Sequence, residues 1–321
     1  MSERVDLVVK KRSMPGTREI RRRIKSVKNT GKITRAMEMI SSVKMRKASA
    51  DIVALRPYAR RAAFALSAVL GARDIRERLP FFSDRSNSIV SKVAYVVVTS
   101  NRGLCGSFNA QALRRLRSEI ESLQSESPGI SVEFVSLGRK GDRGLRALPG
   151  DLIASFSEAS TETQGELSRS VTSFLFDHFE KGRWDRVSIV YTDFVSVLVQ
   201  KPRIRRVLPF FERDAEESIA EMGGTKDSPE RGMGSSSEYI VEPSPESVLR
   251  SLLFRLVETQ VLHAILESKA SEEAARMVAM RNATDAAGEM ADDLTLAFNQ
   301  LRQARVTQEI AELSAGMAAV S

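Results

Sequence analysis

The C-terminal quarter of the chain has a continuous helical pattern of hydrophobic and polar positions. After Pro245 the sequence contains no further proline and only two glycines, Gly288 and Gly316. Small and apolar residues recur there at alternating steps of four and three, the spacing of a seam that another helix covers. The predicted seam consists of Ala283, Ala287, Met290, Leu294, Ala297, Leu301, Ala304, Gln308 and Ala311. We therefore expect residues 244–321 to form one helix, on the order of 100 Å long at about 1.5 Å per residue.

A second long helix is predicted near the N-terminus, over residues 16–75. Thr17 is placed to cap its first turn, where a carboxylate such as Glu19 is also favoured by the helix dipole. Its apolar stripe consists of Ile20, Ile24 and Val27, continued with a shifted phase by Ile33, Met37, Ile40 and Val43. Pro57 is expected to kink or interrupt this helix after Arg56, because proline lacks the amide hydrogen that an interior helical position uses.

Between the two helices, residues 88–211 alternate strand and helix patterns. Predicted strands cover 93–99, 132–137 and 186–193, predicted helices cover 110–123 and 166–181, and residues 194–211 are expected to be extended. Strand–helix–strand order indicates a small α/β domain with parallel neighbouring strands. The turn at 100–109 and the segment Gly138–Gly141 each follow a strand and are interpreted as loops.

These patterns predict an α/β fold with a specific architecture. The N- and C-terminal helices would form a long antiparallel two-helix coiled coil, into which a small Rossmann-like α/β domain is inserted. Residues 1–15 form an N-terminal extension, and residues 212–243, rich in glycine, serine and acidic residues, are expected to be a flexible loop. The alanine-rich seam of the C-terminal helix would let the two helices pack closely.

Charge is distributed unevenly along the chain, whose formal net charge is +8. Residues 10–61 hold 17 Lys and Arg against 3 Asp and Glu, whereas residues 246–321 hold 7 against 11. A basic first helix is compatible with binding nucleic acid, or with neutralisation by an acidic partner helix. The single cysteine, Cys105, excludes an intramolecular disulfide. With no long apolar run and no signal-peptide pattern, we expect a soluble intracellular protein.

Candidate catalytic groups are few. The two histidines, His178 and His263, lie on different predicted helices, and Cys105 is expected to pack into a small space rather than act as a nucleophile. The turn Gly103–Gly106 lacks the Gly-Lys-Ser/Thr ending and the glycine spacing of phosphate-binding loops. Acidic pairs such as Glu272-Glu273 and Asp292-Asp293 are interpreted as solvated helix faces. The residues therefore predict no catalytic, metal or cofactor site, and a mechanical or scaffolding role.

Four segments extend this interpretation because they resemble one known family. REIRRRIKSVKNTGKITRAMEMISSVKMRKA (18–48), SNRGLCGSFN (100–109), GRKG (138–141) and the stretch from ASEEAARM to SAGMAAV (270–320) are similar, in order, to the gamma subunit of the F-type rotary ATP synthase. The two terminal matches are long and specific, and together the four segments span nearly the whole chain.

The resemblance implies a rotor shaft without catalytic activity of its own. In that family the coiled coil enters a hexamer of three alpha and three beta subunits, while the α/β domain contacts the epsilon subunit and the ring of c subunits. Rotation of the shaft couples proton flow to ATP synthesis or hydrolysis in the partners. Such a protein would be peripheral to the membrane, on the cytoplasmic side of the bacterial plasma membrane, and would bind no nucleic acid.

Individual positions also match the family's contact residues. The resemblance implies contacts between shaft and hexamer at Met37, Arg276, Arg302, Gln303, Thr307 and Glu309. From spacing alone, the polar residues among them would be assigned to a solvent-facing helix surface. A basic coiled-coil adaptor that binds nucleic acid or acidic protein partners is the alternative function.

Overall fold

The computed structural model describes residues 17–70, 81, 91–157, 163–210 and 244–320. These residues belong to two compact units, and we describe each by itself. Unit 1 contains residues 17–38 and 280–320, and unit 2 contains the described residues between 39 and 279. The predicted extension at 1–15 and the predicted loop at 212–243 lie outside the described residues.

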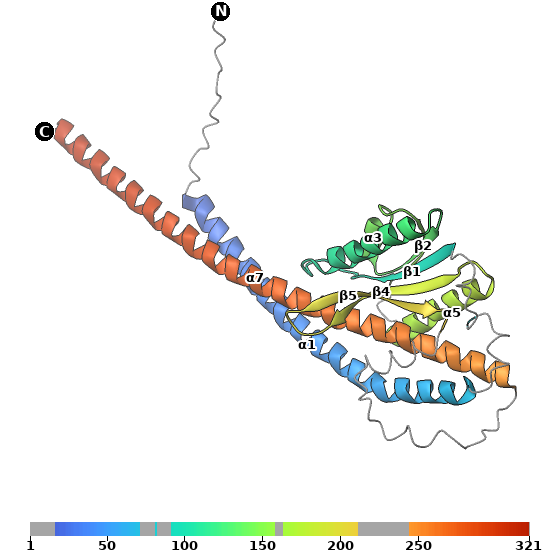
Figure 1. Ribbon diagram of the computed structural model, residues 1–321. Helices are drawn as coiled ribbons and strands as arrows, with labels where there is room; N and C mark the ends of the chain where they lie inside the picture. The colour runs from blue at the N-terminus through green and yellow to red at the C-terminus, as the bar shows by residue number, and fades with distance from the viewer. Residues whose placement is uncertain (1–16, 71–80, 82–90, 158–162, 211–243, 321) are drawn as a thin grey trace, which may run out of the picture. The chain divides into compact units, whose positions relative to one another are not determined.

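Two long helices contribute to both units: α1 (Thr17–Leu70) and α7 (Pro245–Val320). Figure 1 shows α1 in blue and α7 in orange to red. In unit 1 the two helices run antiparallel. Arg21 lies over the ring of Phe298 at 5.2 Å, whereas Thr34, further along α1, shares a 2.6 Å hydrogen bond with the earlier residue Thr284.

The face of α1 that is buried differs from the predicted stripe. Ile20 is 3% exposed, as expected, but Ile33, Ile40 and Val43 are 56–61% exposed, so their assignment to the seam is wrong. Thr34 and Ser41 are buried instead. Within unit 1 the reason is close approach: a side chain at Gly31 would stand 3.5 Å from Cβ of Ala287. Small residues fit this narrow seam, and the larger apolar side chains point outward.

The predicted seam of α7 differs from the less exposed side of the helix at one position between Ala283 and Leu301. Met290 is 54% exposed, and its neighbour Ala291 is 4% exposed. Ala283, Ala287, Leu294, Ala297 and Leu301 of the predicted seam are half-buried, and so are Thr284 and Phe298 beside them. The predicted seam therefore agrees with the less exposed side of α7 from Ala283 to Leu301, except at Met290. Ala304, Gln308 and Ala311 are exposed, because α1 begins opposite the region of Leu301.

Unit 2 is built on a five-stranded sheet. Its elements follow in the order β1 (Lys92–Val98), α3 (Phe108–Glu126), β2 (Ser131–Leu137), α4 (Arg139–Leu145), β3 (Asp151–Phe156), α5 (Gln164–Glu180), β4 (Arg186–Phe194) and β5 (Gln200–Leu208). The strand order is β3-β2-β1-β4-β5, with β1 to β4 parallel and β5 antiparallel to β4. Together with the two long helices, this sheet confirms the predicted α/β fold class.

The alternation of side chains along each strand gives the sheet two apolar faces. Ala94, Val96 and Val98 of β1 pack with α5 and the first part of α7, from Leu249 to Ile265. Val93, Tyr95 and Val97 pack with α3 and α4 on the opposite face. Because β1 is covered on both sides, its sequence is almost entirely apolar. The N-terminal half of α7 is therefore part of the core of unit 2.

Three local predictions are corrected by the structure. Residues 139–141, expected in a loop, begin the short helix α4, which buries Leu145. The edge strand β3 was not predicted. Helix α1 continues past Pro57 to Leu70, so the interruption expected after Arg56 does not occur. Tertiary packing on both sides of Pro57, at Ile52 and Ala59, outweighs the loss of one backbone hydrogen bond.

The crossing from β2 to α4 depends on Gly138. Its φ is +107°, and a Cβ at this position would collide with the carbonyl oxygen of Thr99. Thr99 in turn donates a hydrogen bond from its hydroxyl to the Gly138 carbonyl at 2.9 Å. The ends of β1 and β2 are held together by this contact, which leaves no space for a side chain.

We predict that Gly138→Ala destabilises the protein more than a glycine substitution at an uncrowded site. Gly182 is the matched control, since it has φ +71° with nothing within 4 Å of a built Cβ. Gly182→Ala should cost about 1–2 kcal/mol from the left-handed backbone alone. Gly138→Ala should cost roughly 2 kcal/mol more because of the collision. Urea unfolding of both variants measures their free energies of unfolding. Equal losses of stability would show that the contact with Thr99 adds nothing to the cost of a side chain at Gly138.

Candidate functional site

The carboxyl edge of the sheet is where an open parallel α/β fold usually binds a ligand, at the point where strand order reverses. In this chain that point lies between β1 and β4, and α7 is bonded across the end of β4. Ser268 accepts a hydrogen bond from the backbone N–H of Thr192 at 3.0 Å, and Ser271 donates to the Thr192 carbonyl at 3.1 Å. Glu267 accepts from the N–H of Phe194 at 2.8 Å. The chain's own helix therefore takes the place that a ligand takes in such folds.

The turn after β1 is a tight polar turn, as predicted. The Asn109 side chain closes it, accepting from the N–H of Ser100 at 3.0 Å and donating to the Ser100 hydroxyl at 2.8 Å. It also donates to the sulfur of Cys105 at 3.4 Å. Cys105 is 2% exposed, which agrees with its expected packing role. Leu104 adopts φ +65° and points outward, 62% exposed.

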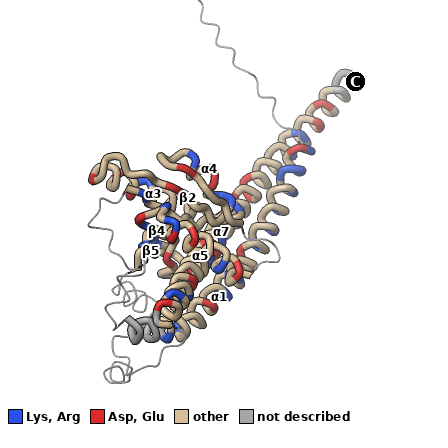
Figure 2. Tube along the Cα trace, turned by 90° about the vertical axis from the view of Figure 1, so that its right-hand side faces the viewer, with Lys and Arg blue, Asp and Glu red and all other residues tan. Residues whose placement is uncertain are grey.

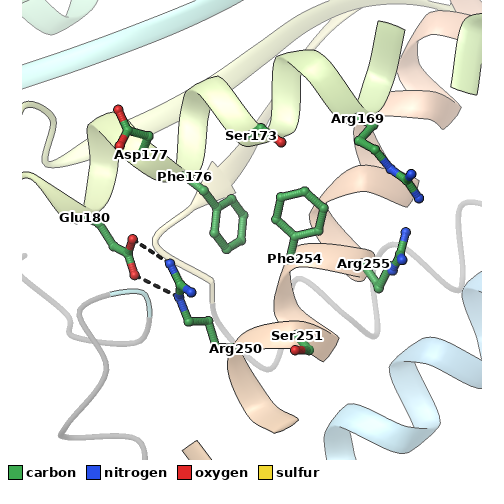
Figure 3. A pocket seen from close by; sticks show the side chains of 9 residues that line it. All are labelled: Arg169, Ser173, Phe176, Asp177, Glu180, Arg250, Ser251, Phe254 and Arg255. Atoms are coloured by element: carbon green, nitrogen blue, oxygen red, sulfur yellow. Dashed lines mark hydrogen bonds and ion pairs between the residues drawn. The ribbon is translucent and has the colours of Figure 1, made fainter. Parts of the chain in front are cut away.

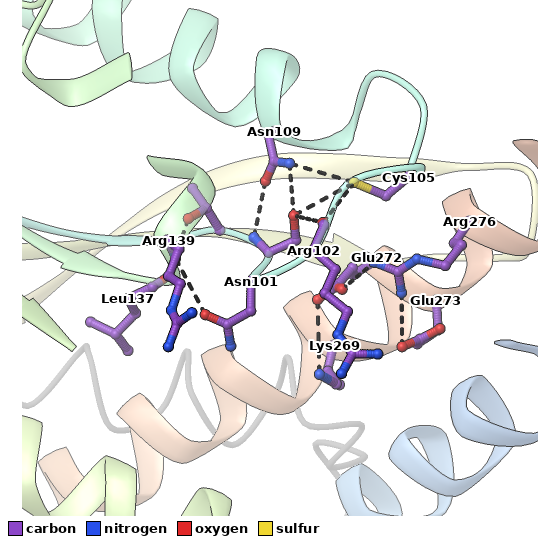
Figure 4. Close-up of polar contacts among 12 residues, drawn as sticks. Asn101, Arg102, Cys105, Asn109, Leu137, Arg139, Lys269, Glu272, Glu273 and Arg276 are labelled. Atoms are coloured by element: carbon purple, nitrogen blue, oxygen red, sulfur yellow. Dashed lines mark hydrogen bonds and ion pairs between the residues drawn. The ribbon is translucent and has the colours of Figure 1, made fainter. Parts of the chain in front are cut away.

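A buried charge cluster joins this turn to α7 (Figure 4). The guanidinium of Arg276 contacts the carboxylates of Glu272 at 2.5 Å and Glu273 at 2.8 Å, and its Nε donates to the Gly103 carbonyl at 3.4 Å. All three charged residues are less than 9% exposed. Burial lowers the pKa of Arg276, but the two carboxylates outweigh it and the net shift is upward. The expectation that Glu272-Glu273 is a solvated face is therefore wrong.

Another buried polar group lies on α7 at His263, which is 2% exposed. Its Nε2 stands 3.5 Å from a carboxylate oxygen of Glu267, and neither ring nitrogen has a hydrogen-bond partner among the described residues. Burial, with Arg205 and Arg56 adding repulsion, lowers the pKa of His263 to about 4. Burial also raises the pKa of the Glu267 carboxyl. His263 is thus neutral at physiological pH.

A cavity of about 450 Å³ lies between α5 and the first turns of α7 (Figure 3). Its apolar floor is formed by Phe176 and Phe254, whose ring centroids are 5.1 Å apart. The three arginines at its rim are already paired: Arg250 with Glu180 at 2.7 Å, and both Arg169 and Arg255 with Glu258, at 3.2 Å and 2.8 Å. These internal ion pairs occupy the groups that would bind an anion, so we assign no ligand to this cavity.

Five of the six predicted contact residues lie in unit 1. Arg302, Gln303, Thr307 and Glu309 are exposed on the part of α7 beyond Leu301, and Met37 is half-buried on α1. Glu309 pairs with Arg305 at 3.0 Å, an exposed ion pair of small energetic value. Figure 2 shows positive and negative residues interspersed along the helical segment that ends at the C-terminus.

The sixth predicted residue, Arg276, is in a different environment. It lies in unit 2, is 7% exposed, and is bonded to its own helix and to the turn after β1. Arg276 therefore joins α7 to the turn after β1 within unit 2. Sequence reasoning missed its partners, although the positions of Glu272 and Glu273, four and three residues before Arg276 on one helix, were the available signal.

Two further features of the described residues bear on other functions. No helix among them is long and apolar enough to span a bilayer. They also contain no group of three or more His, Cys, Asp or Glu side chains placed to hold a metal ion.

We predict that Arg276→Met lowers the free energy of unfolding by about 3–5 kcal/mol, because it leaves the buried Glu273 carboxylate without a cation and Glu272 with only the 4.0 Å contact to Lys269. Arg281→Met is the control: Arg281 is exposed on the same helix, and its loss should change stability by less than about 0.5 kcal/mol. Chemical unfolding at pH 7 measures both. Similar losses of stability in the two variants would show that the buried ion pairs of Arg276 do not stabilise the fold.

We further predict a pH-dependent contribution from His263. The imidazole of His263 binds a proton near pH 6.5 in the unfolded chain, but only near pH 4 in the folded chain. Acidification therefore stabilises the unfolded state, and the wild type should lose roughly 3 kcal/mol between these pH values relative to His263→Leu. Unfolding curves of both proteins at pH 8, 6, 5 and 4 measure this. Parallel pH profiles would mean that His263 titrates normally in the fold.

Comparison with known proteins supplies the family. The family model described as ATP synthase matches residues 16–320. ATP synthase gamma chains from Heliobacterium modesticaldum and Chloroflexus aurantiacus are 39% and 40% identical, each aligned over 96% of this chain and 100% of its own length. The gamma chain of Roseiflexus sp. is 40% identical over 96% of this chain and 99% of its own.

Solved structures agree at the level of the fold. A chain of the Euglena gracilis mitochondrial ATP synthase, in its OSCP/F1/c-ring structure, has a TM-score of 0.60 at 20% identity, covering 95% of this chain and 94% of its own. A chain of the Tetrahymena thermophila central stalk and c-ring has a TM-score of 0.54 at 23% identity, covering 78% and 99%. The residues matched by the family model and the identity to full-length relatives lead to one conclusion: the chain belongs to the ATP synthase gamma chain family.

Proposed function

We propose that this chain is the rotating shaft of a proton-translocating ATP synthase and has no catalytic activity of its own. Its family makes it a central-stalk subunit. We propose three alpha and three beta subunits as the surrounding catalytic hexamer, and the epsilon subunit and the c-subunit ring as partners of the α/β domain. We place it as a peripheral protein on the cytoplasmic face of the bacterial plasma membrane.

One observation carries the proposal: α1 buries small polar residues and exposes large apolar ones. Thr34 and Ser41 are at most 9% exposed, whereas Ile33 is 61% exposed. A helix that served only to pair with α7 would place its apolar side chains in the seam. Exposed apolar side chains mark a surface that another protein covers. A shaft enclosed by a hexamer needs such an outer surface.

The exposed polar residues at the end of α7 are proposed as further contacts with the hexamer. Arg302, Gln303, Thr307 and Glu309 offer hydrogen-bond donors and acceptors on the segment that extends beyond α1. We propose Met37 as a contact on α1. We do not retain Arg276 in this set, because its guanidinium is engaged within the chain.

The mechanism follows from asymmetry and does not require a reactive group. Each orientation of an asymmetric shaft presents a different surface to each beta subunit, and so stabilises a different conformation there. The nucleotide chemistry would belong to the partners. The buried cluster around Arg276 and the bonds from Ser268 and Ser271 to β4 support this role, since they attach the part of α7 in unit 2 to the sheet.

Native mass spectrometry of the chain co-expressed with its cognate alpha and beta subunits tests the proposal. We expect one copy of this chain per three alpha and three beta subunits, with ATPase activity in that assembly only. If the chain remains separate and copurifies with nucleic acid in a salt-sensitive manner, the adaptor function is the better account. The family match over residues 16–320 does not favour that alternative.

We predict that Met37→Lys leaves assembly intact but reduces coupling. A lysine at this half-buried position would add an ion pair with an acidic partner surface, worth about 1 kcal/mol in one orientation of the shaft, enough to lower ATP-driven proton pumping roughly fivefold. Asn29→Lys, which adds the same charge at an exposed polar position of α1, is the control. Pumping in membrane vesicles, normalised to ATP hydrolysis, measures the effect. Equal pumping by both variants and the wild type would remove Met37 from the contact set.

A further inference from the structure

A polar junction lies in unit 2, where α1, α7 and the end of β4 meet. The apolar cluster that joins these elements consists of Ala48, Ile52, Leu266, Ala270 and Phe194. Arg56 follows Ile52 by one helical turn on α1, and His263 precedes Leu266 by about one turn on α7. The charge of Arg56 acts on His263, so the two side chains lie near each other beside the apolar cluster.

Two polar groups of this junction are buried without a hydrogen-bond partner in the part of the chain that the structure describes. His263 is 2% exposed, and neither of its ring nitrogens is hydrogen-bonded; its Nε2 stands 3.5 Å from the Glu267 carboxylate. The Nε atom of Arg56 is buried and unbonded as well. Buried N–H groups in folded proteins are nearly always satisfied by protein, water or an ion. Both side chains therefore lack an acceptor.

The charges that act on His263 are positive. Burial lowers the pKa of His263 most, and the charges of Arg205 on β5 and Arg56 on α1 lower it further. Arg205 is oriented by Tyr191, since its Nη2 donates to the Tyr191 hydroxyl at 3.1 Å and its guanidinium carbon lies 5.5 Å from the centre of the ring. Both cations thus approach the imidazole from elements other than its own helix. A positive potential in buried surroundings favours an anion over water or a cation as the missing acceptor.

The carboxyl groups of the junction are engaged elsewhere. Asp193, on β4, is paired with Arg203 at 2.9 Å, which neutralises its charge. Glu267, on α7, accepts a hydrogen bond from the backbone at the end of β4, and burial raises the pKa of its carboxyl. Neither carboxyl group is hydrogen-bonded to the imidazole. The acceptor for His263 must therefore come from outside this set of residues.

The burial of the junction limits the size of that acceptor, because His263 and Glu267 are both less than 9% exposed. We propose that the junction binds one small monovalent anion, of the size of chloride, that accepts hydrogen bonds from the His263 imidazole and from Nε of Arg56. Such an ion satisfies both groups and joins α1 to α7 within unit 2. The proposal concerns the chain by itself and does not rest on the shaft function.

Anion binding and protonation of His263 are linked. A bound anion stabilises the imidazolium more than the neutral imidazole, so it raises the pKa of His263 from its low value in the fold. By the same linkage, protonation of His263 strengthens anion binding. The ion therefore changes the titration of one specific group, which a purely structural role of His263 would not do.

NMR titration of the full-length chain, labelled with ¹⁵N at histidine, tests the proposal. The probe is chloride at about 200 mM, compared at the same ionic strength with gluconate, an anion too large for the junction. We expect chloride to raise the pKa of His263 by about 1, which is a tenfold gain in proton affinity. The other histidine, His178, has a side chain that is 22% exposed on α5, and its titration curve should be the same in both salts.

Two outcomes of this titration would overturn the proposal. Equal pKa values of His263 in the two salts would leave water as the partner of the unbonded ring nitrogens. A change of equal size in the curves of both histidines would identify a general effect of salt instead of a bound ion.

The line width of ³⁵Cl in solutions of the protein gives a second measurement, since bound chloride relaxes faster than free chloride. Arg56→Lys keeps the positive charge but removes the Nε–H group, and we expect it to weaken chloride binding about tenfold. Arg61→Lys is the matched control, because Arg61 is exposed on the same helix, and it should bind chloride as the wild type does. Equal binding by the wild type and both variants, or an equal loss in both variants, would exclude the Arg56 contact and with it the proposed site.

Discussion

The attachment of α7 to the carboxyl edge of the sheet is the constraint on which the rest of the structure depends. Leu249 to Ile265 complete the apolar face of the sheet, and Glu267, Ser268 and Ser271 then bond the backbone at the end of β4. Because those backbone groups are buried, each needs a hydrogen-bond partner, and only a helix at this position and rotation supplies it. The rotation of α7 is thereby fixed in unit 2.

The cluster around Arg276 shows the energetic cost of this arrangement. Two adjacent glutamates are held away from water, which is unfavourable unless a cation neutralises them. Arg276 meets both carboxylates and also reaches the Gly103 carbonyl. Such a cluster gives geometric specificity more than net stability, since only one placement of the helix against the turn satisfies all of its members.

In unit 1 a different requirement governs packing. The helices approach each other through Gly31, Thr34 and Ala287, and the threonine pair shares a hydrogen bond inside the seam. Close approach restricts the seam to small side chains, so the apolar residues of α1 must face outward. The same composition that makes the helix pair narrow therefore gives it an outer surface suited to an enclosing partner.

The elements and their order could be derived from the sequence by itself. Buried strands such as β1 have a continuous apolar sequence, and the long helices lack internal breakers over most of their length, so local patterns sufficed for β1, β2, β4, α3, α5 and α7. The family resemblance added the residues that we propose as contacts with the hexamer. Sequence reasoning failed at β3, a half-exposed edge strand, and at α4, whose start depends on a glycine turn.

Only the tertiary structure decided which faces are buried. Steps of four and three fit two neighbouring phases of a helix almost equally well, and hydrophobicity favoured Met290 and Ile33, whereas close packing selected Ala291 and Thr34. The burial of Glu272, Glu273 and His263 likewise could not be predicted from the sequence, because burial of a charged or polar side chain depends on neighbours distant along the chain. Local pattern determines that a helix forms, and the space available between packed elements determines which of its residues lie inside.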